Sequence, residues 1–224
     1  GLSDRQAATL KVNPSTAWRM LHDFVNLPPG AWVIQNAGNS AVGRHVIQLA
    51  HAKGWRTLSL VRRPELVDEL LGIGADAVFL DQDESLDEAR SRMGTPSPTL
   101  GLNAVGGESA TRLMKLLGEK ATLVTYGGMS KRPLTIPTGP LIFRDLKISG
   151  FWLTRWWRTA ERAEKISMLS ELALLARAGQ LSAPVDRVFP LADIKQAVLR
   201  AAEPGRTGKV LLALADIANE PAAA

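Results

Sequence analysis

The residues of this sequence that are best suited to chemistry form a short segment with a glycine at each end, Gly38 and Gly43. An apolar run from Trp32 precedes it, and apolar residues at helical spacing follow it. A strand, a tight turn and a helix in this order point backbone N–H groups and the positive helix end toward the space above a sheet. The segment therefore suits the diphosphate of a dinucleotide, although an ordinary strand-to-helix turn has the same layout.

The segment departs in one place from the dinucleotide-binding fingerprint G-x-G-x-x-G, because Ser40 stands where the pattern has its second glycine. Serine is small enough to let a diphosphate approach, and Asn39 tolerates left-handed backbone angles better than most residues. The candidate diphosphate contacts are Gly38, Asn39, Ser40, Ala41, Val42 and Gly43.

An arginine pair, Arg62 and Arg63, follows the second expected strand. A carboxylate at this place would accept hydrogen bonds from the ribose hydroxyls of an adenine nucleotide, whereas arginines suit a 2′-phosphate through charge-assisted bonds. If the glycine segment binds a dinucleotide, the pair favours the phosphorylated form, NADPH. The alternative is that both arginines are solvated residues ahead of a helix.

Two glycines follow the fifth expected strand, in the segment Tyr126, Gly127, Gly128 and Met129. They let the main chain pass close to a flat ligand, while the tyrosine ring and the methionine thioether offer apolar surface. A simple turn after a core strand would use the same residues. Lys209, at the start of the last expected strand, is either a phosphate or carboxylate contact or a solvated lysine.

An aromatic cluster follows the sixth expected strand in a chain with only 5% aromatic residues. It consists of Phe151, Trp152 and Leu153, and then Trp156 and Trp157. Such a cluster is more typical of a core or a subunit interface than of a ligand wall.

Several kinds of site are excluded or disfavoured. The chain has no cysteine, which excludes disulfides, thiolate metal sites and a cysteine nucleophile. His45 and His51 would lie about 120° apart around a helix and His22 is remote, so we expect no metal. No carboxylate pair, catalytic triad or nucleophile elbow stands at a recognisable spacing.

The composition is that of a globular protein, with 46% hydrophobic and 22% charged residues. No apolar run is long enough for a transmembrane helix, so we expect no membrane partner. The net charge of +5 comes from 27 basic and 22 acidic residues spread along the chain. Solvated faces account for that charge, which argues against a nucleic-acid partner.

The elements that must position these residues alternate between strands and helices. Residues 13–16 are expected to form a turn and N-cap before the first helix. Six strands joined by helices indicate an α/β fold with a doubly wound parallel sheet of the Rossmann type, whose ligands lie at the carboxyl ends of the strands. The expected strands are 32–34, 57–61, 74–80, 100–104, 121–126 and 146–152, and the expected helices are 17–24, 64–71, 81–88, 109–117 and 158–178.

We expect three parts: a hinge and helix segment at 1–30, an NADP-binding Rossmann domain at 31–180 and a C-terminal segment at 181–224. The last segment predicts a strand at 185–190, a helix at 191–202 and a strand at 208–214, which do not continue the alternation. The chain does not begin with Met and is interpreted as cut from a longer protein. The C-terminal segment is therefore expected to return to a domain outside this chain.

Five segments read NPSTAWRML from Asn13, VIQNAGNSAVG from Val33, LNAVGG from Leu102, VTYGGM from Val124 and GFWL from Gly150. Together they resemble the zinc-free medium-chain dehydrogenase/reductase superfamily, and within it the mitochondrial-type trans-2-enoyl-CoA (enoyl thioester) reductases. The resemblance extends to about residue 214. The combination of QNAGNSAVG and YGGM is specific, whereas the general fold is much less so.

The resemblance implies NADPH-dependent reduction of a 2-enoyl thioester of coenzyme A or acyl carrier protein in fatty acid metabolism, with hydride transfer to the carbon β to the carbonyl. It also implies a homodimer through the sixth strand. The family's N-terminal GroES-like domain and its proton-donating tyrosine are absent, so we expect NADPH binding with little activity. The implied cofactor contacts are Asn13, residues 39–42, Arg62 and Arg63, residues 126–129, Phe151, Trp152, Leu153, and Lys209.

Two other functions stay open at this point. One is an NADPH-dependent quinone or alkenal reductase of the same superfamily, which would differ mainly in the domain outside this chain. The other is a non-catalytic relative that senses NADPH or binds RNA. A bacterial cytoplasm is the expected location, with a mitochondrial matrix as the alternative if a targeting segment has been removed.

Overall fold

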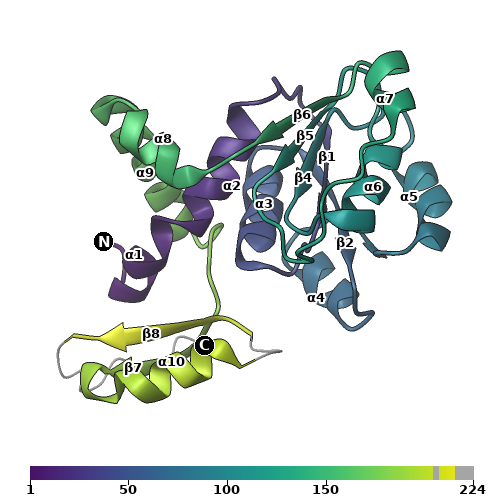
Figure 1. The fold of residues 1–224 in the computed structure, drawn as a ribbon. Coiled ribbons are helices and arrows are strands. Elements are labelled where there is room, and N and C mark those ends of the chain that lie inside the picture. The colour runs from purple at the N-terminus through teal and green to yellow at the C-terminus, as the bar shows by residue number, and fades with distance from the viewer. Residues whose placement is uncertain (204–206, 215–224) are drawn as a thin grey trace.

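The computed structural model describes residues 1–203 and 207–214, and its centre is a six-stranded sheet (Figure 1). All neighbouring strands run parallel, in the order β3-β2-β1-β4-β5-β6. This order confirms the doubly wound Rossmann sheet that was expected. The strands are β1 (Trp32–Asn36), β2 (Arg56–Val61), β3 (Ala77–Leu80), β4 (Leu100–Asn103), β5 (Thr122–Thr125) and β6 (Lys147–Gly150).

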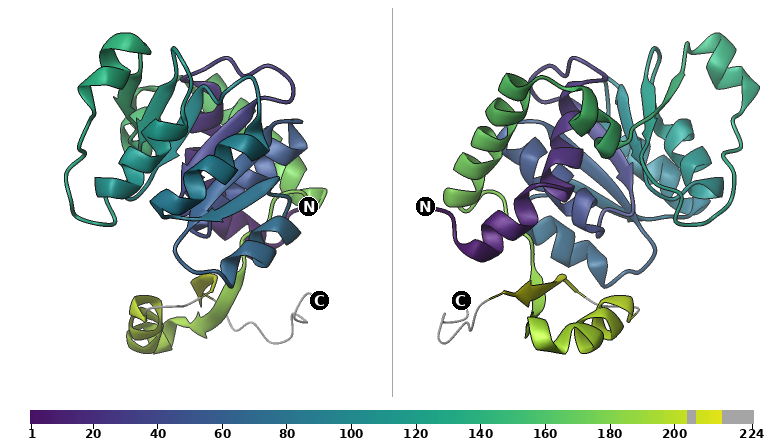
Figure 2. Two further views of the ribbon diagram at one scale, coloured as in Figure 1. Left: turned by 90° about the vertical axis from the view of Figure 1, so that its right-hand side faces the viewer. Right: turned by 60° about the vertical axis from the view of Figure 1, so that its left-hand side comes forward.

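Helices cover both faces of this sheet (Figure 2). On one face, α2 (Asn13–His22), α3 (Ala41–Ala52) and α9 (Arg162–Arg177) share a core with β1, β4 and β5. On the same side, α4 (Leu66–Gly72) packs against α3, β2 and β3. On the opposite face lie α5 (Leu86–Met93) and α6 (Gly107–Leu116).

The strands are apolar on both sides because both faces are covered. Val33 points into the core shared with α2 and α3, whereas its neighbours Trp32 and Ile34 point into the core shared with α5 and α6. This is the two-residue alternation of a strand. The polar exceptions Gln35 and Asn36 are fully buried at the end of β1, which places them directly beneath the strand ends.

The N-terminal region differs from the expectation in two ways. A helix that was not expected, α1 (Asp4–Leu10), begins after Ser3, whose hydroxyl accepts from the Gln6 N–H while the Gln6 side chain accepts from the Ser3 N–H. This reciprocal capping box satisfies two donors at the helix start. The turn expected at 13–16 is wrong, because these residues form the first turn of α2, where Pro14 is tolerated.

The single helix expected at 158–178 is also wrong. The chain forms α8 (Leu153–Thr159) and then α9, with extended backbone at Ala160 and Glu161 between them. The break lets Trp156 and Trp157, which meet edge to face with ring centres 5.1 Å apart, pack on the core shared by α2 and α9. Tertiary packing of the two rings thus outweighs continuous helix periodicity.

Two other expected elements shift. The helix expected at 81–88 is a short 3₁₀ turn, Asp83–Ser85, followed by α5. The long connection from β5 to β6 contains a helix that was not expected, α7 (Thr138–Phe143). The sixth strand is shorter than expected and leaves Phe151 and Trp152 outside it.

The C-terminal segment contains the two strands and the helix that were expected, and the strands form a sheet of their own (Figure 1). Strands β7 (Val185–Pro190) and β8 (Lys209–Ala213) pair in parallel, and α10 (Ile194–Ala202) packs on both. Neither strand joins the six-stranded sheet. We call β7, α10 and β8 the C-terminal unit.

Candidate functional site

A cleft of about 630 Å³ lies at the carboxyl ends of the parallel strands. This is the edge of an open α/β sheet where ligands bind, and the volume lies within the range typical of ligand sites. The turns after β1 to β5 line it, and the lining is completed by residues 182–184, just before β7, and 208–209, at the start of β8. The lining residues that bear on function are Asn39, Ser40, Ala41, Arg44, His45, Arg62, Asp81, Gly106, Gly107, Glu108, Ser109, Arg112, Met129, Ser130, Arg132 and Lys209.

The two outer glycines of the fingerprint are needed for close packing. A Cβ on Gly38 would lie 2.6 Å from the Cβ of Ser59, and a Cβ on Gly43 would lie 2.6 Å from the carbonyl oxygen of Gly38. The turn therefore rests directly on β2, and α3 rests directly on the turn. This is the role that the fingerprint gives to its first and third glycines.

Ser40, which replaces the second glycine, caps α3. Its backbone is extended and its hydroxyl accepts from the Gly43 N–H at 3.1 Å. The N–H groups of Ala41 and Val42 belong to the first turn of α3, where no helix carbonyl is available to them. These two donors lie at the positive end of α3 beside Asn39 and Ser40, an arrangement that is suited to an anion.

The structure separates the two arginines that follow β2. Arg62 is exposed and lines the cleft. Arg63 does not line it and forms an exposed ion pair with Glu65 at 3.5 Å. Of the pair, only Arg62 is therefore placed to meet a phosphate in the cleft.

The segment after β5 contributes Met129 to the cleft and keeps Tyr126 beneath it. Met129 is 62% exposed, whereas the Tyr126 hydroxyl is buried. That hydroxyl faces the Ser40 side chain without a hydrogen bond of good geometry, and burial raises the pKa of Tyr126 to about 12. Tyr126 thus stays protonated at neutral pH, and Gly127 and Gly128 form the turn between it and Met129.

The remaining predicted residues occupy varied places. Lys209 lines the cleft, and its charge acts on the neighbouring His45. Asn13 begins α2, away from the cleft lining. Phe151 packs edge to face on Phe24 with ring centres 6.0 Å apart. The predicted residues that line the cleft are Asn39, Ser40, Ala41, Arg62, Met129 and Lys209. Those that do not line it are Asn13, Gly38, Val42, Gly43, Arg63, Tyr126, Gly127, Gly128, Phe151, Trp152 and Leu153.

The cleft is electropositive. Its lining contains five cationic side chains and two carboxylates, and one of the carboxylates is already paired. An excess of positive charge in a concave site attracts an anionic ligand. The cations are Arg44, Arg62, Arg112, Arg132 and Lys209, and the carboxylates are Asp81 and Glu108.

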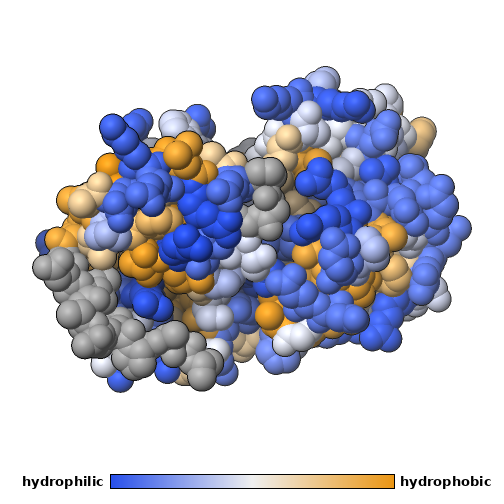
Figure 3. Space-filling model, turned by 90° about the horizontal axis from the view of Figure 1, so that it is seen from below, coloured by the Kyte–Doolittle hydropathy of each residue, from blue (hydrophilic) through white to orange (hydrophobic). Residues whose placement is uncertain are grey.

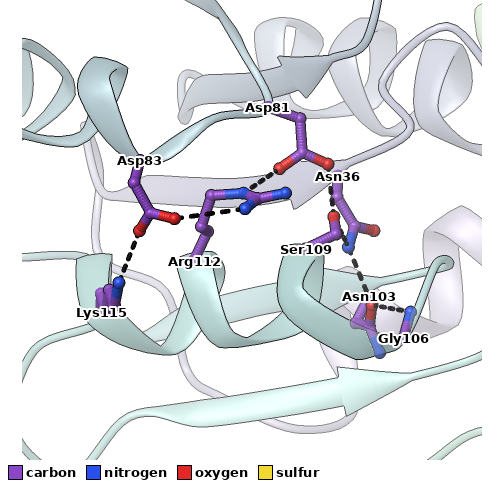
Figure 4. A network of polar contacts seen from close by, with 8 residues as sticks. All are labelled: Asn36, Asp81, Asp83, Asn103, Gly106, Ser109, Arg112 and Lys115. Atoms are coloured by element: carbon purple, nitrogen blue, oxygen red, sulfur yellow. Dashed lines mark hydrogen bonds and ion pairs between the residues drawn. The ribbon is translucent and has the colours of Figure 1, made fainter. Parts of the chain in front are cut away.

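Sequence reasoning missed a buried amide network beneath the cleft (Figure 4). The Asn36 amide donates to Asn103 Oδ1 at 2.8 Å and to Ser109 Oγ at 2.8 Å, and its oxygen accepts from the Ala104 N–H at 2.7 Å. Asn103 Oδ1 also accepts from the N–H groups of Val105 and Gly106. The network fixes the turn after β4 to β1, and the signal for it was a polar residue at the end of each of two apolar strands.

A second part of the network neutralises the tip of β3 (Figure 4). Asp81 accepts from Ser109 Oγ at 2.6 Å and from Arg112 Nε at 2.7 Å. Arg112 also lies 3.4 Å from Asp83, which pairs with Lys115 at 2.5 Å. Because Asp81 is paired in this way, its charge does not oppose a phosphate near Arg62.

His45 was also missed as a site residue. It is 1% exposed, and its Nδ1 lies 3.3 Å from Gln48 Oε1, which accepts from the Ser182 N–H at 3.1 Å. Since that oxygen is an acceptor, His45 Nδ1 carries the proton and Nε2 is a buried acceptor without a partner among the described residues. Burial lowers the pKa of His45 to about 4, so the ring is neutral at pH 7.

Residues 41–171 match the family model described as zinc-binding dehydrogenase. Zinc itself does not fit the part of the chain that the structure describes. There is no cysteine in the sequence, and residues 1–203 and 207–214 contain no group of three or more His, Asp or Glu side chains placed to hold a metal ion. The same ranges hold no helix of the length and apolarity that crossing a membrane requires.

The chain is 44% identical over 215 residues to the mitochondrial enoyl-[acyl-carrier-protein] reductase of Rattus norvegicus, a match that covers 94% of this chain and 58% of that protein. It therefore spans little more than half the length of this curated relative.

The mitochondrial 2-enoyl thioester reductase Etr1p/Etr2p heterodimer from Candida tropicalis superposes with a TM-score of 0.82 at 33% identity, over 94% of this chain and 62% of that one. A complex of Etr1p with NADP and crotonyl-CoA superposes with a TM-score of 0.81 at 33% identity, over 90% and 60% of the two chains. With its doubly wound sheet, glycine turn and matched family model, the chain belongs to the zinc-binding dehydrogenase family of the medium-chain dehydrogenase/reductase superfamily.

Proposed function

We propose that this chain is the cofactor-binding part of an NADPH-dependent 2-enoyl thioester reductase of fatty acid metabolism. The observation that carries the proposal is the electropositive cleft at the strand ends, with the capped glycine turn on one side and Arg62 on the other. The similarity to enoyl-acyl-carrier-protein reductases supports it. NADPH, when bound, supplies the hydride that reduces the carbon β to the thioester carbonyl.

The cofactor would be held by groups with separate tasks. The N–H groups of Ala41 and Val42 would bind the diphosphate, and Arg62 would bind the 2′-phosphate. Met129, in the turn after β5, and Lys209, at the start of β8, would contact the cofactor from other parts of the cleft lining. The predicted residues that do not line the cleft are proposed either to support its lining or to contact the cofactor in the complete protein.

The substrate proposed is a 2-enoyl thioester, carried by coenzyme A or by acyl carrier protein. The acyl pocket and the proton donor would belong to the part of the longer protein that this chain does not span. A bacterial cytoplasm, the location that the sequence favoured, remains a proposal without support from the relatives above. Their names describe them as mitochondrial, which supports a mitochondrial location, the alternative.

We also propose the division into a hinge segment at 1–30, an NADP-binding domain at 31–180 and a return segment at 181–224. The C-terminal unit exposes apolar side chains along α10: Ile194 is 45% exposed, Val198 62% and Leu199 70%. In the view from below (Figure 3), apolar residues also gather on the left-hand lobe, the side on which the C-terminal unit lies. An apolar face on so small a unit supports packing against a further domain of the longer protein.

The first experiment is a calorimetric titration of the chain with NADPH and, separately, with NADH. We expect NADPH to bind more tightly, and Arg62→Ala to weaken NADPH binding roughly 10- to 100-fold while NADH changes little, because a charge-assisted hydrogen bond is lost. Arg63→Ala is the matched control, since Arg63 pairs with Glu65 outside the cleft, and it should have a much smaller effect. Failure of the chain to bind either nucleotide would overturn the proposed function. Reduction of crotonyl-CoA by this chain alone would show that no further domain is needed.

The proposed dimer uses β6, the last strand of the sheet order, which among the described residues pairs only with β5 and leaves its other edge open. Exposed apolar residues flank it, with Phe143 81% exposed before it and Trp152 58% exposed after it. We expect light scattering to give about twice the 24.2 kDa mass of one chain. Gly150→Pro should give the monomer mass, because the Phe151 N–H bonds to β5 and the neighbouring Gly150 N–H faces the open edge. A monomeric unmodified chain would contradict this interface.

A further inference from the structure

We propose that Arg132 is a second determinant of specificity for NADPH, binding the 2′-phosphate of the cofactor from the turn after β5, in the cleft that Arg62 also lines. The inference rests on the proposed function and extends it. In the strand order, β2 and β5 lie on opposite sides of β1 and β4. Arg62 follows β2 and Arg132 follows β5, and both line the same cleft.

The backbone of Arg132 is held firmly at this place. The Met129 N–H donates to the Ala104 carbonyl at 3.0 Å, and the Ser130 N–H and Oγ both donate to the Val105 carbonyl, at 3.0 and 2.7 Å. The Arg132 N–H then donates to Ser130 Oγ at 3.2 Å. The turn after β5 is thereby bonded onto the turn after β4, which the amide network fixes to β1.

Arg132 lies against two glycines, with its side chain on Gly107 and its carbonyl oxygen on Gly106. A Cβ on Gly107 would lie 3.3 Å from Arg132 Cβ and 3.5 Å from its Cδ, and a Cβ on Gly106 would lie 2.8 Å from the Arg132 carbonyl oxygen. The arginine stem therefore lies directly against the start of α6. Any larger side chain at Gly107 would fill the space through which Arg132 reaches the cleft.

The cationic side chains of the cleft differ in whether they already form an ion pair. Arg44 pairs with Glu69, and Arg112 pairs with Asp81. Within residues 1–203 and 207–214, Arg62 and Arg132 make no ion pair. Arg132 is thus not paired with Glu108, the carboxylate of the cleft lining that follows Gly107. Two exposed guanidinium groups that line one cleft, from turns on either side of β1 and β4, are suited to bind one dianionic phosphate together.

The test uses the adenosine half of the cofactor alone. Adenosine 2′,5′-bisphosphate and 5′-AMP differ only in the 2′-phosphate, so the ratio of their dissociation constants isolates that group. We expect Arg132→Ala to weaken binding of the bisphosphate about tenfold, the loss of one charge-assisted bond of about 1.4 kcal/mol, and to leave 5′-AMP within about twofold. Arg132→Lys should retain part of the affinity, since it keeps the charge without the planar fork.

Lys131→Ala is the matched control, because it removes the same charge from the neighbouring residue, which does not line the cleft. It should leave both dissociation constants unchanged. The inference is overturned if Arg132→Ala leaves bisphosphate binding intact, or if it weakens 5′-AMP equally, which would assign Arg132 to the adenine or the 5′-phosphate. The proposed function fails separately, if the unmodified chain binds neither NADPH nor the bisphosphate.

Discussion

Replacement of Gly43 by alanine is expected to abolish NADPH binding and to lower the free energy of unfolding by about 3 kcal/mol. The new Cβ would lie 2.6 Å from the Gly38 carbonyl oxygen and 2.7 Å from that of Ala37. Both are backbone atoms of the turn, so neither can rotate away. The turn or the start of α3 must move, and the N–H groups of Ala41 and Val42 move with it.

Gly72→Ala is the matched control for this substitution. Gly72 is the last residue of α4, and a Cβ there meets nothing within 4 Å. Alanine at that position should leave NADPH binding unchanged and leave the stability equal or slightly higher, since alanine favours a helix more than glycine does. Urea unfolding and calorimetric titration measure both quantities. A Gly43→Ala protein that unfolds and binds like the parent would show that the turn does not need this close contact.

The second large effect is expected at Asn36, where alanine should lower the free energy of unfolding by about 3 kcal/mol. The substitution removes two donated hydrogen bonds and one accepted bond. It leaves the Ala104 N–H without its partner at a site that water does not reach, because Ala104 is fully buried. The turn after β4 should loosen, and with it the turn after β5 that carries Arg132, so NADPH affinity should fall as well.

Two comparisons make the Asn36 prediction sharper. Asn26→Ala changes an exposed asparagine and should cost little. Asn36→Asp keeps the side-chain shape but sets an oxygen against the Asn103 oxygen, so it should be at least as damaging as alanine at neutral pH. If Asn36→Asp were as stable as the parent protein, Asn36 would not be the donor in its hydrogen bond with Asn103.

The local pattern of the sequence determined the fold class and the position of the glycine turn. Apolar alternation and helical spacing are properties of neighbouring residues, so they predicted all six strands of the sheet and the turn between Gly38 and Gly43. The fingerprint could be interpreted for the same reason, since its three parts lie within one strand, turn and helix. Boundaries were less well predicted where packing competes with periodicity, as at Ala160, where the chain breaks so that two tryptophans reach the core.

Only the tertiary structure decided which side chains share the cleft. Arg62 and Arg63 are equivalent in the sequence, but the direction of the chain after β2 sends one to the cleft and the other to Glu65. Asn36 meets Asn103, and Gln48 meets Ser182, because the sheet and the return of the C-terminal segment bring together elements far apart in the chain. Arg132 belongs to the same class, since nothing near it in the sequence indicates that it lies over the glycines after β4. Contacts of this kind depend on strand order and on the crossing of loops, which no local pattern of residues encodes.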